Sequence, residues 1–238
     1  MIENVKRKYL GESESQMKTM IFKNRQEAGQ RLATALTKRG YKGENTLVLG
    51  IPRGGLVVAD EVAKALSAIL DVIITQKLRA PYQPELGIGA VVNGDHVTIN
   101  EDLSRAVGAT QEYLNREVVY QKEEIERRLR FYRGERPAPE ISGKTVIVVD
   151  DGIATGYTFR AALESLRQRY PDRLVAAAPV AALDSAEMLK AFADEVVCLH
   201  TPVSFFAVGS WYQNFDQVSD EEAAAILRRN WSWWSQAA

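Results

Sequence analysis

Short apolar runs alternate with helical patterns along most of the chain. The apolar runs predict buried strands at 46–49, 71–76, 145–149, 174–179 and 195–199. Apolar residues that recur every three or four positions predict helices at 24–39, 56–70, 157–169 and 185–192. Strands that are apolar throughout and alternate with helices are typical of a parallel sheet with both faces covered. We therefore expect an α/β fold, a parallel twisted sheet with helices on both faces.

The middle of the chain departs from this alternation. The turn Asn93-Gly94-Asp95 separates two apolar stretches, GIGAVV and HVTIN, and so predicts a β-hairpin. The highly charged stretch 104–133 predicts one long helix with a solvated face. Its acidic and basic residues are spaced for i,i+4 ion pairs, namely Glu112/Arg116, Glu123/Arg127, Glu124/Arg128 and Glu126/Arg130.

Both ends of the chain differ from the centre. Residues 1–20 are polar and mixed, which predicts a loose N-terminal arm before a single domain over 21–238. The last residues predict a short helix at 220–229, followed by Trp231, Trp233 and Trp234. We expect these tryptophans to pack on the body of the protein or on a second subunit. Neither a secretory signal nor an apolar run of about 18 residues is evident, so we expect a cytoplasmic protein without a membrane span.

Composition narrows the classes of function. The chain has 238 residues, of which 46% are apolar and 26% are charged, and these are ordinary globular values. Thirty basic residues against 31 acidic ones give a net charge of −1, which argues against a general nucleic-acid or membrane-surface binder. The single cysteine, Cys198, excludes a disulfide framework within the chain. His96 and His200 lie far apart, which disfavours a histidine-rich metal centre.

The most informative segment is 146–158, with the sequence VIVVDDGIATGYT. An apolar strand leads directly into Asp150 and Asp151, and a glycine- and threonine-rich turn then opens a helix. Free amides at a helix start, together with glycines, form an anion site, whereas two carboxylates suit ribose hydroxyls or a Mg²⁺ shell. The plainer interpretation is two solvated aspartates followed by a helix cap. We interpret the loop as a site for a phosphorylated sugar.

This segment resembles the phosphoribosyl-pyrophosphate signature of the type I phosphoribosyltransferases: four apolar residues, two acids and a turn that ends in Thr-Gly-x-Thr. Weaker similarities extend from about Phe22 to Asp216. The resemblance implies that Asp150 and Asp151 bind the ribose hydroxyls of the donor, and Mg²⁺ directly or through water. It also implies that the loop holds the 5′-phosphate through Gly152, Ile153, Ala154, Thr155, Gly156, Tyr157 and Thr158.

Two further segments match the family by position. The turn 50–55 (GIPRGG) resembles its pyrophosphate loop, in which Arg53, Gly54 and Gly55 would bind the leaving group. Lys77 and Arg79 resemble the basic residues that neutralise pyrophosphate, and they are our candidate catalytic cations. The plainer interpretations are a glycine-rich turn and ordinary surface charges. Residues 77–100 would then form a mobile flap that closes over the donor.

The acceptor is less well defined. Residues 201–216 resemble the hood that covers the base in this family, and Phe206 and Trp211 are our candidates for stacking on it. We expect at least three of the five hood aromatics to pack within the protein instead. Hypoxanthine and guanine enzymes carry an aspartate at the position of Ala154 and a lysine on the next strand, whereas 174–182 has no basic residue. Gly152 stands where many members have an aliphatic residue, which suggests a looser or differently bent loop.

These features together predict a Mg²⁺-dependent transfer of phosphoribosyl from phosphoribosyl pyrophosphate to a nitrogenous, nucleobase-like acceptor. A non-catalytic regulator that binds the same donor or a nucleotide is the main alternative. A phosphohydrolase would require more carboxylates or histidines around the metal than we find. The resemblance also implies a homodimer, with the long helix and the tryptophan-rich tail as surfaces for contact.

Overall fold

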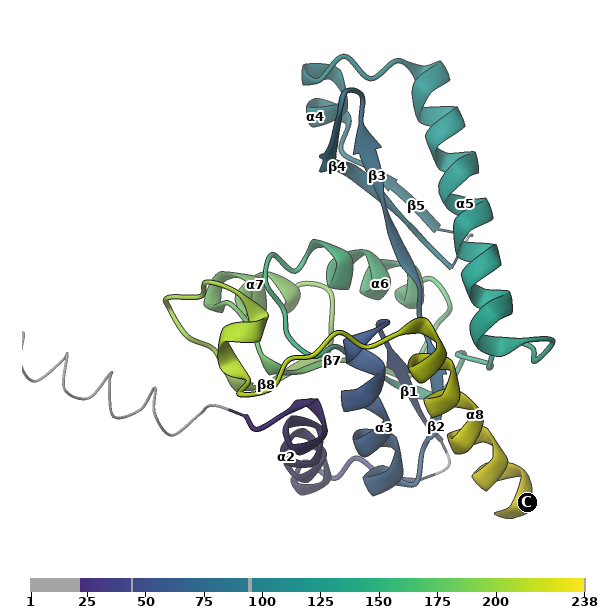
Figure 1. The fold of residues 1–238 in the computed structure, drawn as a ribbon, viewed down its shortest axis with the longest axis vertical. Helices are drawn as coiled ribbons and strands as arrows, with labels where there is room; N and C mark the ends of the chain where they lie inside the picture. Colours follow the sequence, from purple (N-terminus) through teal and green to yellow (C-terminus); the bar gives the residue numbers. More distant parts are fainter. Residues whose placement is uncertain (1–21, 44, 94–95, 238) are drawn as a thin grey trace, which may run out of the picture.

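A computed structural model describes residues 22–43, 45–93 and 96–237, with side chains as far as Ser232 (Figure 1). The predicted arm at 1–20 and the centre of the turn at 94–95 lie outside the described residues, as do the side chains of Trp233 and Trp234. In the described part of the chain, no helix is both long and apolar enough to cross a membrane.

The centre of the molecule is a five-stranded parallel sheet in the order β2-β1-β6-β7-β8. Its strands are β1 (Thr46–Gly50), β2 (Ile69–Val72), β6 (Thr145–Val149), β7 (Arg173–Val180) and β8 (Glu195–His200). The register is unbroken across the middle, where Leu47 pairs with Val146 and Val146 pairs with Leu174. The predicted parallel α/β sheet is confirmed.

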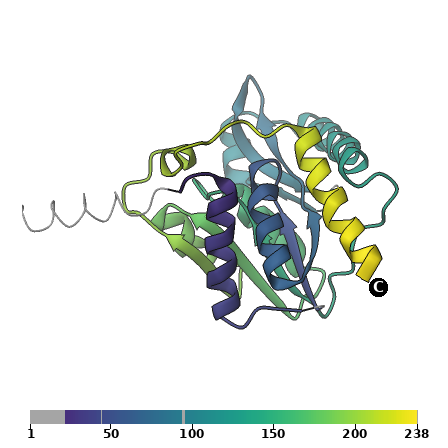
Figure 2. The ribbon, with the colours of Figure 1, turned by 60° about the horizontal axis from the view of Figure 1, so that its bottom comes forward.

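Helices cover both faces of this sheet (Figures 1 and 2). Alternate strand residues such as Val48 pack towards α2 (Arg25–Lys38) and α3 (Gly54–Leu66). Their neighbours, such as Leu47, pack towards α6 (Tyr157–Arg167), beside which α7 (Leu183–Leu189) lies. Burial on both faces explains why these strands are apolar at nearly every position.

A second, three-stranded antiparallel sheet projects from the body and comprises β3 (Thr75–Ala80), β4 (Gln83–Val92) and β5 (His96–Ile99) (Figure 1). The predicted hairpin corresponds to β4 and β5. The expectation of one strand over 71–76 is wrong, because β2 ends at Val72 and β3 begins at Thr75. The amide of Ile73 still bonds to the first sheet, through Gly50 O, whereas that of Ile74 bonds to Asn93 in the second. One apolar run therefore serves two sheets.

Two predicted helices also have different bounds. The single helix over 104–133 is wrong: α4 (Glu101–Ala106) ends before Gly108, which has φ +71°, and α5 (Gln111–Arg133) begins after Thr110. The hydroxyl of Thr110 accepts the amide of Tyr113 and so caps the new helix. The helix expected over 56–70 begins two residues earlier, at Gly54, and ends at Leu66, which leaves residues 69–70 to β2.

The predicted ion pairs of the charged helix form only in part. Glu112–Arg116 and Glu126–Arg130 are present in α5. The other two arginines choose different partners, because Arg127 pairs with Glu124 and Arg128 with Asp220. The second of these contacts joins α5 to the last helix, which a pattern of local charges could not predict.

The chain ends in α8 (Asp220–Ala237), which continues beyond the predicted 220–229. It lies against α3, β2 and α5 (Figure 2). Trp231 is buried, and its indole N–H donates to Leu70 O at 2.8 Å. Asn230 accepts the Leu70 amide at 3.1 Å. The expected packing on the body is therefore confirmed for Trp231.

Candidate active site

The two acidic residues singled out by the sequence follow directly after β6. Asp150 and Asp151 are half-buried, and the amide of Asp151 donates to Asp150 Oδ1 at 2.8 Å. Burial raises the pKa of the Asp150 carboxyl well above its ordinary value, and the negative charge of Asp151 raises it further. Burial also raises the pKa of Asp151, although Arg25 opposes this effect. An acid pair that is costly to ionise is a recognised feature of functional sites.

The loop after the acids is held against the next strand. The Ile153 amide donates to Val180 O at 2.9 Å, and the Ala182 amide donates back to Ile153 O at 2.9 Å. Gly156 has φ +73°, which favours glycine, and α6 begins at the following residue. The exposed residues of this turn are Ala154, Thr155, Tyr157 and Thr158. The first amides of α6 and the threonine hydroxyls therefore lie where an anion can reach them.

The loop after β1 packs directly on the acid pair. A Cβ on Gly55 would lie 2.8 Å from Asp150 Oδ1 and 2.9 Å from the Asp150 Cα. A Cβ on Gly54 would overlap the Asp151 carboxylate. Arg53, which precedes the first turn of α3, is half-buried, and the peptide before it is cis. Both glycines are required by this close approach, which brings the two predicted binding loops together.

Gly152 meets the hood, which contains the 3₁₀ turn η1 (Val208–Trp211). A Cβ on Gly152 would overlap the side chain of Val208 and lie 3.2 Å from Val180 Cγ1. Of the two alternatives, the looser loop is wrong, because Val208 fills the space that a side chain at 152 would occupy.

Replacing Gly152 by alanine is expected to push the hood off the loop. Overpacking of this kind costs roughly 1–3 kcal/mol, and urea unfolding would measure it. The double variant Gly152→Ala/Val208→Ala removes the clashing methyl groups and should recover most of the loss. If Val208→Ala adds its own loss to that of Gly152→Ala, the clash is not the cause.

Most hood aromatics pack against the protein. Trp211 and Tyr212 are buried, while Phe205 and Phe215 pack against the same cluster. Phe206 is fully exposed. The structure thus places the two predicted stacking residues in opposite settings: Trp211 lies edge-on to His200 with ring centroids 4.7 Å apart, whereas Phe206 faces solvent.

Sequence reasoning missed Arg25, the first residue of α2. Its Nε lies 2.6 Å from Asp151 Oδ2, and its side chain is 11% exposed. Tyr212 also reaches this position, because its hydroxyl donates to Asp151 O. Burial and the nearby Asp151 carboxylate raise the pKa of Tyr212, so the phenol stays protonated and remains a donor. A cation in the first turn of a helix is electrostatically unfavourable, and that was the available signal.

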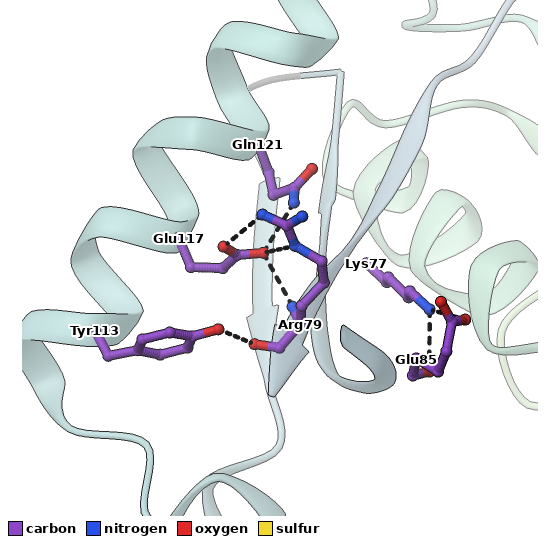
Figure 3. A network of polar contacts seen from close by, with 6 residues as sticks. All are labelled: Lys77, Arg79, Glu85, Tyr113, Glu117 and Gln121. Atoms are coloured by element: carbon purple, nitrogen blue, oxygen red, sulfur yellow. Dashed lines mark hydrogen bonds and ion pairs between the residues drawn. The ribbon is translucent and has the colours of Figure 1, made fainter. Parts of the chain in front are cut away.

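The two candidate cations of the flap have very different partners (Figure 3). Lys77 contacts Glu85 at 3.1 Å on the neighbouring strand, and the Glu85 side chain is 98% exposed. Such a surface pair contributes about 0–1 kcal/mol, so Lys77 can be released readily. The Arg79 guanidinium instead donates twice to buried Glu117 of α5, at 2.7 and 3.0 Å. No hydrogen bond or ion pair among the described residues joins either cation to the acid pair.

Glu117, on α5, holds the antiparallel sheet β3–β5 to this helix through Arg79 of β3. It also accepts the Arg79 amide and the Gln121 side chain, while Tyr113 donates to Arg79 O at 2.8 Å (Figure 3). Burial pushes the pKa of Glu117 up, but the hydrogen bonds from Arg79 and Gln121 outweigh it and hold this pKa below its ordinary value. Ionised Glu117 therefore stabilises the folded protein. This stabilisation is fully present above the pKa of an unfolded glutamate, about 4.3, and is lost as pH falls through the pKa of Glu117 in the folded protein.

Replacing Glu117 by glutamine is expected to lower the free energy of unfolding by about 1–2 kcal/mol at pH 7, because charge-assisted hydrogen bonds are lost. The difference from wild type should shrink as pH falls through the lowered folded-state pKa of Glu117, where Glu117 itself becomes protonated. Urea unfolding at several pH values measures both effects. Glu112→Gln is the matched control on the same helix, because Glu112 is 82% exposed and pairs only at 3.9 Å. An equal loss in both variants would contradict this role of Glu117.

The site suits a magnesium ion that is shared with a substrate. Mg²⁺ prefers oxygen ligands and is usually held by one or two carboxylates together with substrate phosphates. Asp150 and Asp151 supply such a pair beside two glycine-rich loops. Among the described residues there is no group of three or more histidine, cysteine, aspartate or glutamate side chains placed to hold a metal alone. The donor set therefore fits a metal that arrives with a phosphorylated ligand.

Comparison with known proteins gives one family. The model of the phosphoribosyl transferase domain matches residues 18–214. Curated proteins of Mycobacterium tuberculosis, Rv0571c in strain H37Rv and MT0597 in strain CDC 1551, are 41% identical over 209 residues and carry provisional phosphoribosyl transferase names. The match covers 88% of this chain and 47% of theirs, so the chain spans about half the length of these relatives. The crystal structure of TT1426 from Thermus thermophilus is 44% identical, with a TM-score of 0.76 over 88% of this chain and 99% of that one.

Proposed function

The chain belongs to the phosphoribosyl transferase family, and from this premise we propose that it transfers phosphoribosyl from phosphoribosyl pyrophosphate to a nitrogenous acceptor. The observation that carries the proposal is the contact between the acid pair and the loop after β1. Asp150 and Asp151 directly follow β6, and Gly54 and Gly55 approach them so closely that no side chain fits between. Carboxylates for a ribose and amides for phosphates are thereby combined in one site.

In this proposal each part of the donor has its own partner. The carboxylates of Asp150 and Asp151 accept hydrogen bonds from the ribose hydroxyls. The amides at the start of α6, with Thr155 and Thr158, bind the 5′-phosphate. Arg53 and the amides of residues 54–55 bind the pyrophosphate. Bound Mg²⁺ would supply positive charge that offsets the charge of the leaving pyrophosphate.

The reaction needs no nucleophile from the protein. The acceptor nitrogen attacks C1 of the ribose and the bond from C1 to pyrophosphate breaks, through a state with oxocarbenium character. The protein stabilises charge that develops on the leaving group and keeps water from C1. We assign Lys77 as the flap cation that can turn to the pyrophosphate, because its bond to exposed Glu85 is weak. Arg79 would have to give up buried Glu117 to do the same.

Isothermal titration with phosphoribosyl pyrophosphate and Mg²⁺ tests the donor site. Micromolar binding is expected, whereas ribose 5-phosphate, which lacks the pyrophosphate, should bind more weakly. Pyrophosphate release is then measured with a panel of purine and pyrimidine bases. Absence of donor binding by the folded protein would overturn the proposal.

One observation favours a second candidate, a regulator that binds the donor or a nucleotide without reaction. The Arg79 guanidinium is already held by Glu117, so one of the two family cations is engaged within the protein. Donor binding without pyrophosphate release for any base would support the regulator. Release with one base would exclude it.

A further inference from the structure

Arg25 joins three parts of the candidate site through one guanidinium group. Its Nε contacts Asp151 Oδ2 at 2.6 Å, and its Nη1 donates to the backbone oxygen of Asp216 at 2.7 Å. Its Cζ lies 3.7 Å from the centroid of the Phe215 ring. A carboxylate of the candidate donor loop (150–158), a carbonyl of the hood and an aromatic face of the hood therefore all meet the same cation.

Other contacts also hold the hood, and they divide between two parts of the protein. The segment that leads into α2 forms three backbone bonds with it: Phe22 N to Trp211 O, Gln213 N to Phe22 O and Asn214 N to Lys23 O. The hydroxyl of Tyr212 reaches Asp151 O. The bonds from 22–23 hold the hood to the start of α2, whereas Arg25, Tyr212 and the packing of Val208 on Gly152 hold it to the donor loop.

The position of Arg25 is demanding in chemical terms. An arginine presents five donors in a planar fork and can stack on a ring with its flat face, whereas lysine is a compact point charge. A lysine at 25 could still reach Asp151, but it could not also bond Asp216 O and stack on Phe215. A Cβ added to Gly54 would lie only 2.5 Å from Arg25 Nε, so the loop 50–55 also packs against the Arg25 guanidinium.

We propose that Arg25 is a positioning residue that holds the acceptor hood against the donor loop and transmits donor binding to the hood. This inference rests on the proposed function, because it takes Asp151 as a ligand of the donor ribose. The Arg25 bond is made to Oδ2 of Asp151, and in this proposal a ribose hydroxyl bonds the same carboxylate. A donor that fixes the Asp151 carboxylate thus also fixes Arg25, Asp216 and Phe215. In this proposal the Phe215 ring of the hood becomes ordered once the donor is bound.

The test is amide hydrogen exchange followed by mass spectrometry, with peptides from the hood (202–216) and from the donor loop (150–158). In ligand-free protein, Arg25→Lys should speed hood exchange by about tenfold, while peptides from β1 and α3 stay as in wild type. Arg39→Lys is the matched control, because Arg39 follows the other end of α2 and pairs with Glu195 instead. Unchanged hood exchange in Arg25→Lys, or a uniform increase along the whole chain, would overturn the proposal.

Addition of phosphoribosyl pyrophosphate and Mg²⁺ separates positioning from simple stabilisation. In wild type and Arg39→Lys, the donor should slow exchange in both peptides. In Arg25→Lys, protection of 150–158 should persist while protection of the hood is lost. If the donor still slows hood exchange in Arg25→Lys, Arg25 does not transmit donor binding to the hood. A wild-type protein with no response to the donor overturns the proposed function, and the ligand-free comparison still decides whether Arg25 holds the hood.

Discussion

Replacing Asp150 by asparagine is expected to weaken binding of phosphoribosyl pyrophosphate by roughly 10- to 100-fold, because hydrogen bonds to a charged group contribute about 1.5–3 kcal/mol. Asparagine keeps the oxygen that accepts the Asp151 amide, so the local backbone is retained. The variant also removes a half-buried carboxyl whose ionisation is disfavoured by burial and by the neighbouring Asp151 charge. We therefore expect it to be as stable as wild type or more so, which is the usual trade between stability and function at a site.

Isothermal titration in Mg²⁺, together with thermal unfolding of the same samples, measures both quantities. Asp172→Asn is the matched control, since Asp172 is exposed and lies just before β7, at the opposite end of the strands from the acid pair. Its donor affinity should equal that of wild type. If Asp150→Asn bound the donor with wild-type affinity, the Asp150 carboxylate would not be a ligand of the donor.

Replacing Arg133 by alanine is expected to lower the free energy of unfolding by about 3–5 kcal/mol, because it leaves a buried carboxylate without its partner. Arg133 ends α5, and its Nε lies 2.9 and 3.1 Å from the two oxygens of Asp71 in β2. Its Nη2 also donates to Val72 O at 3.0 Å. The side chains of Arg133 and Asp71 are only 9% and 4% exposed, so little water can replace the lost contact.

Thermal unfolding should show a fall in Tm of roughly 10 °C for a chain of this size. Arg130→Ala makes the same chemical change on the same helix, but Arg130 is 78% exposed and its pair with Glu126 should contribute only about 0–1 kcal/mol. Adding Asp71→Asn to Arg133→Ala removes the unpaired charge and should recover part of the loss. Equal losses in Arg133→Ala and Arg130→Ala would show that burial does not govern this pair.

Arg133 also explains how the projecting sheet is held to the body. The first turns of α5 contact β3 through Tyr113 and Glu117, and the last residue of α5, Arg133, contacts β2. The helix therefore spans from the flap to the edge of the main sheet (Figure 1). Loss of Glu117 should loosen the flap alone, whereas loss of Arg133 should affect the main sheet.

The sequence by itself determined the parallel sheet and was enough to single out 150–158 as the candidate donor loop. The strands are apolar at nearly every position, and this pattern follows from burial on both faces. Asp150, Asp151 and the glycines of 152–158 are contiguous, so their spacing could be recognised without a fold. The glycines at 54 and 55 were predicted as part of an anion loop, although the carboxylates that demand them were not predicted as neighbours.

Only the tertiary structure decided which distant partners the charged residues of the site and the flap contact. Arg25 lies 126 positions from Asp151, and Arg79 lies 38 from Glu117, so no local pattern relates them. The break at Gly108 and the division of 71–76 between two sheets were also missed. Periodicity alone does not reveal where one element ends and the next begins. The local spacing of apolar residues indicates which face of a helix or strand is buried. The partner of a charged side chain depends on how distant elements pack, and at this site that packing determines both the burial of Asp151 and its contact with the hood.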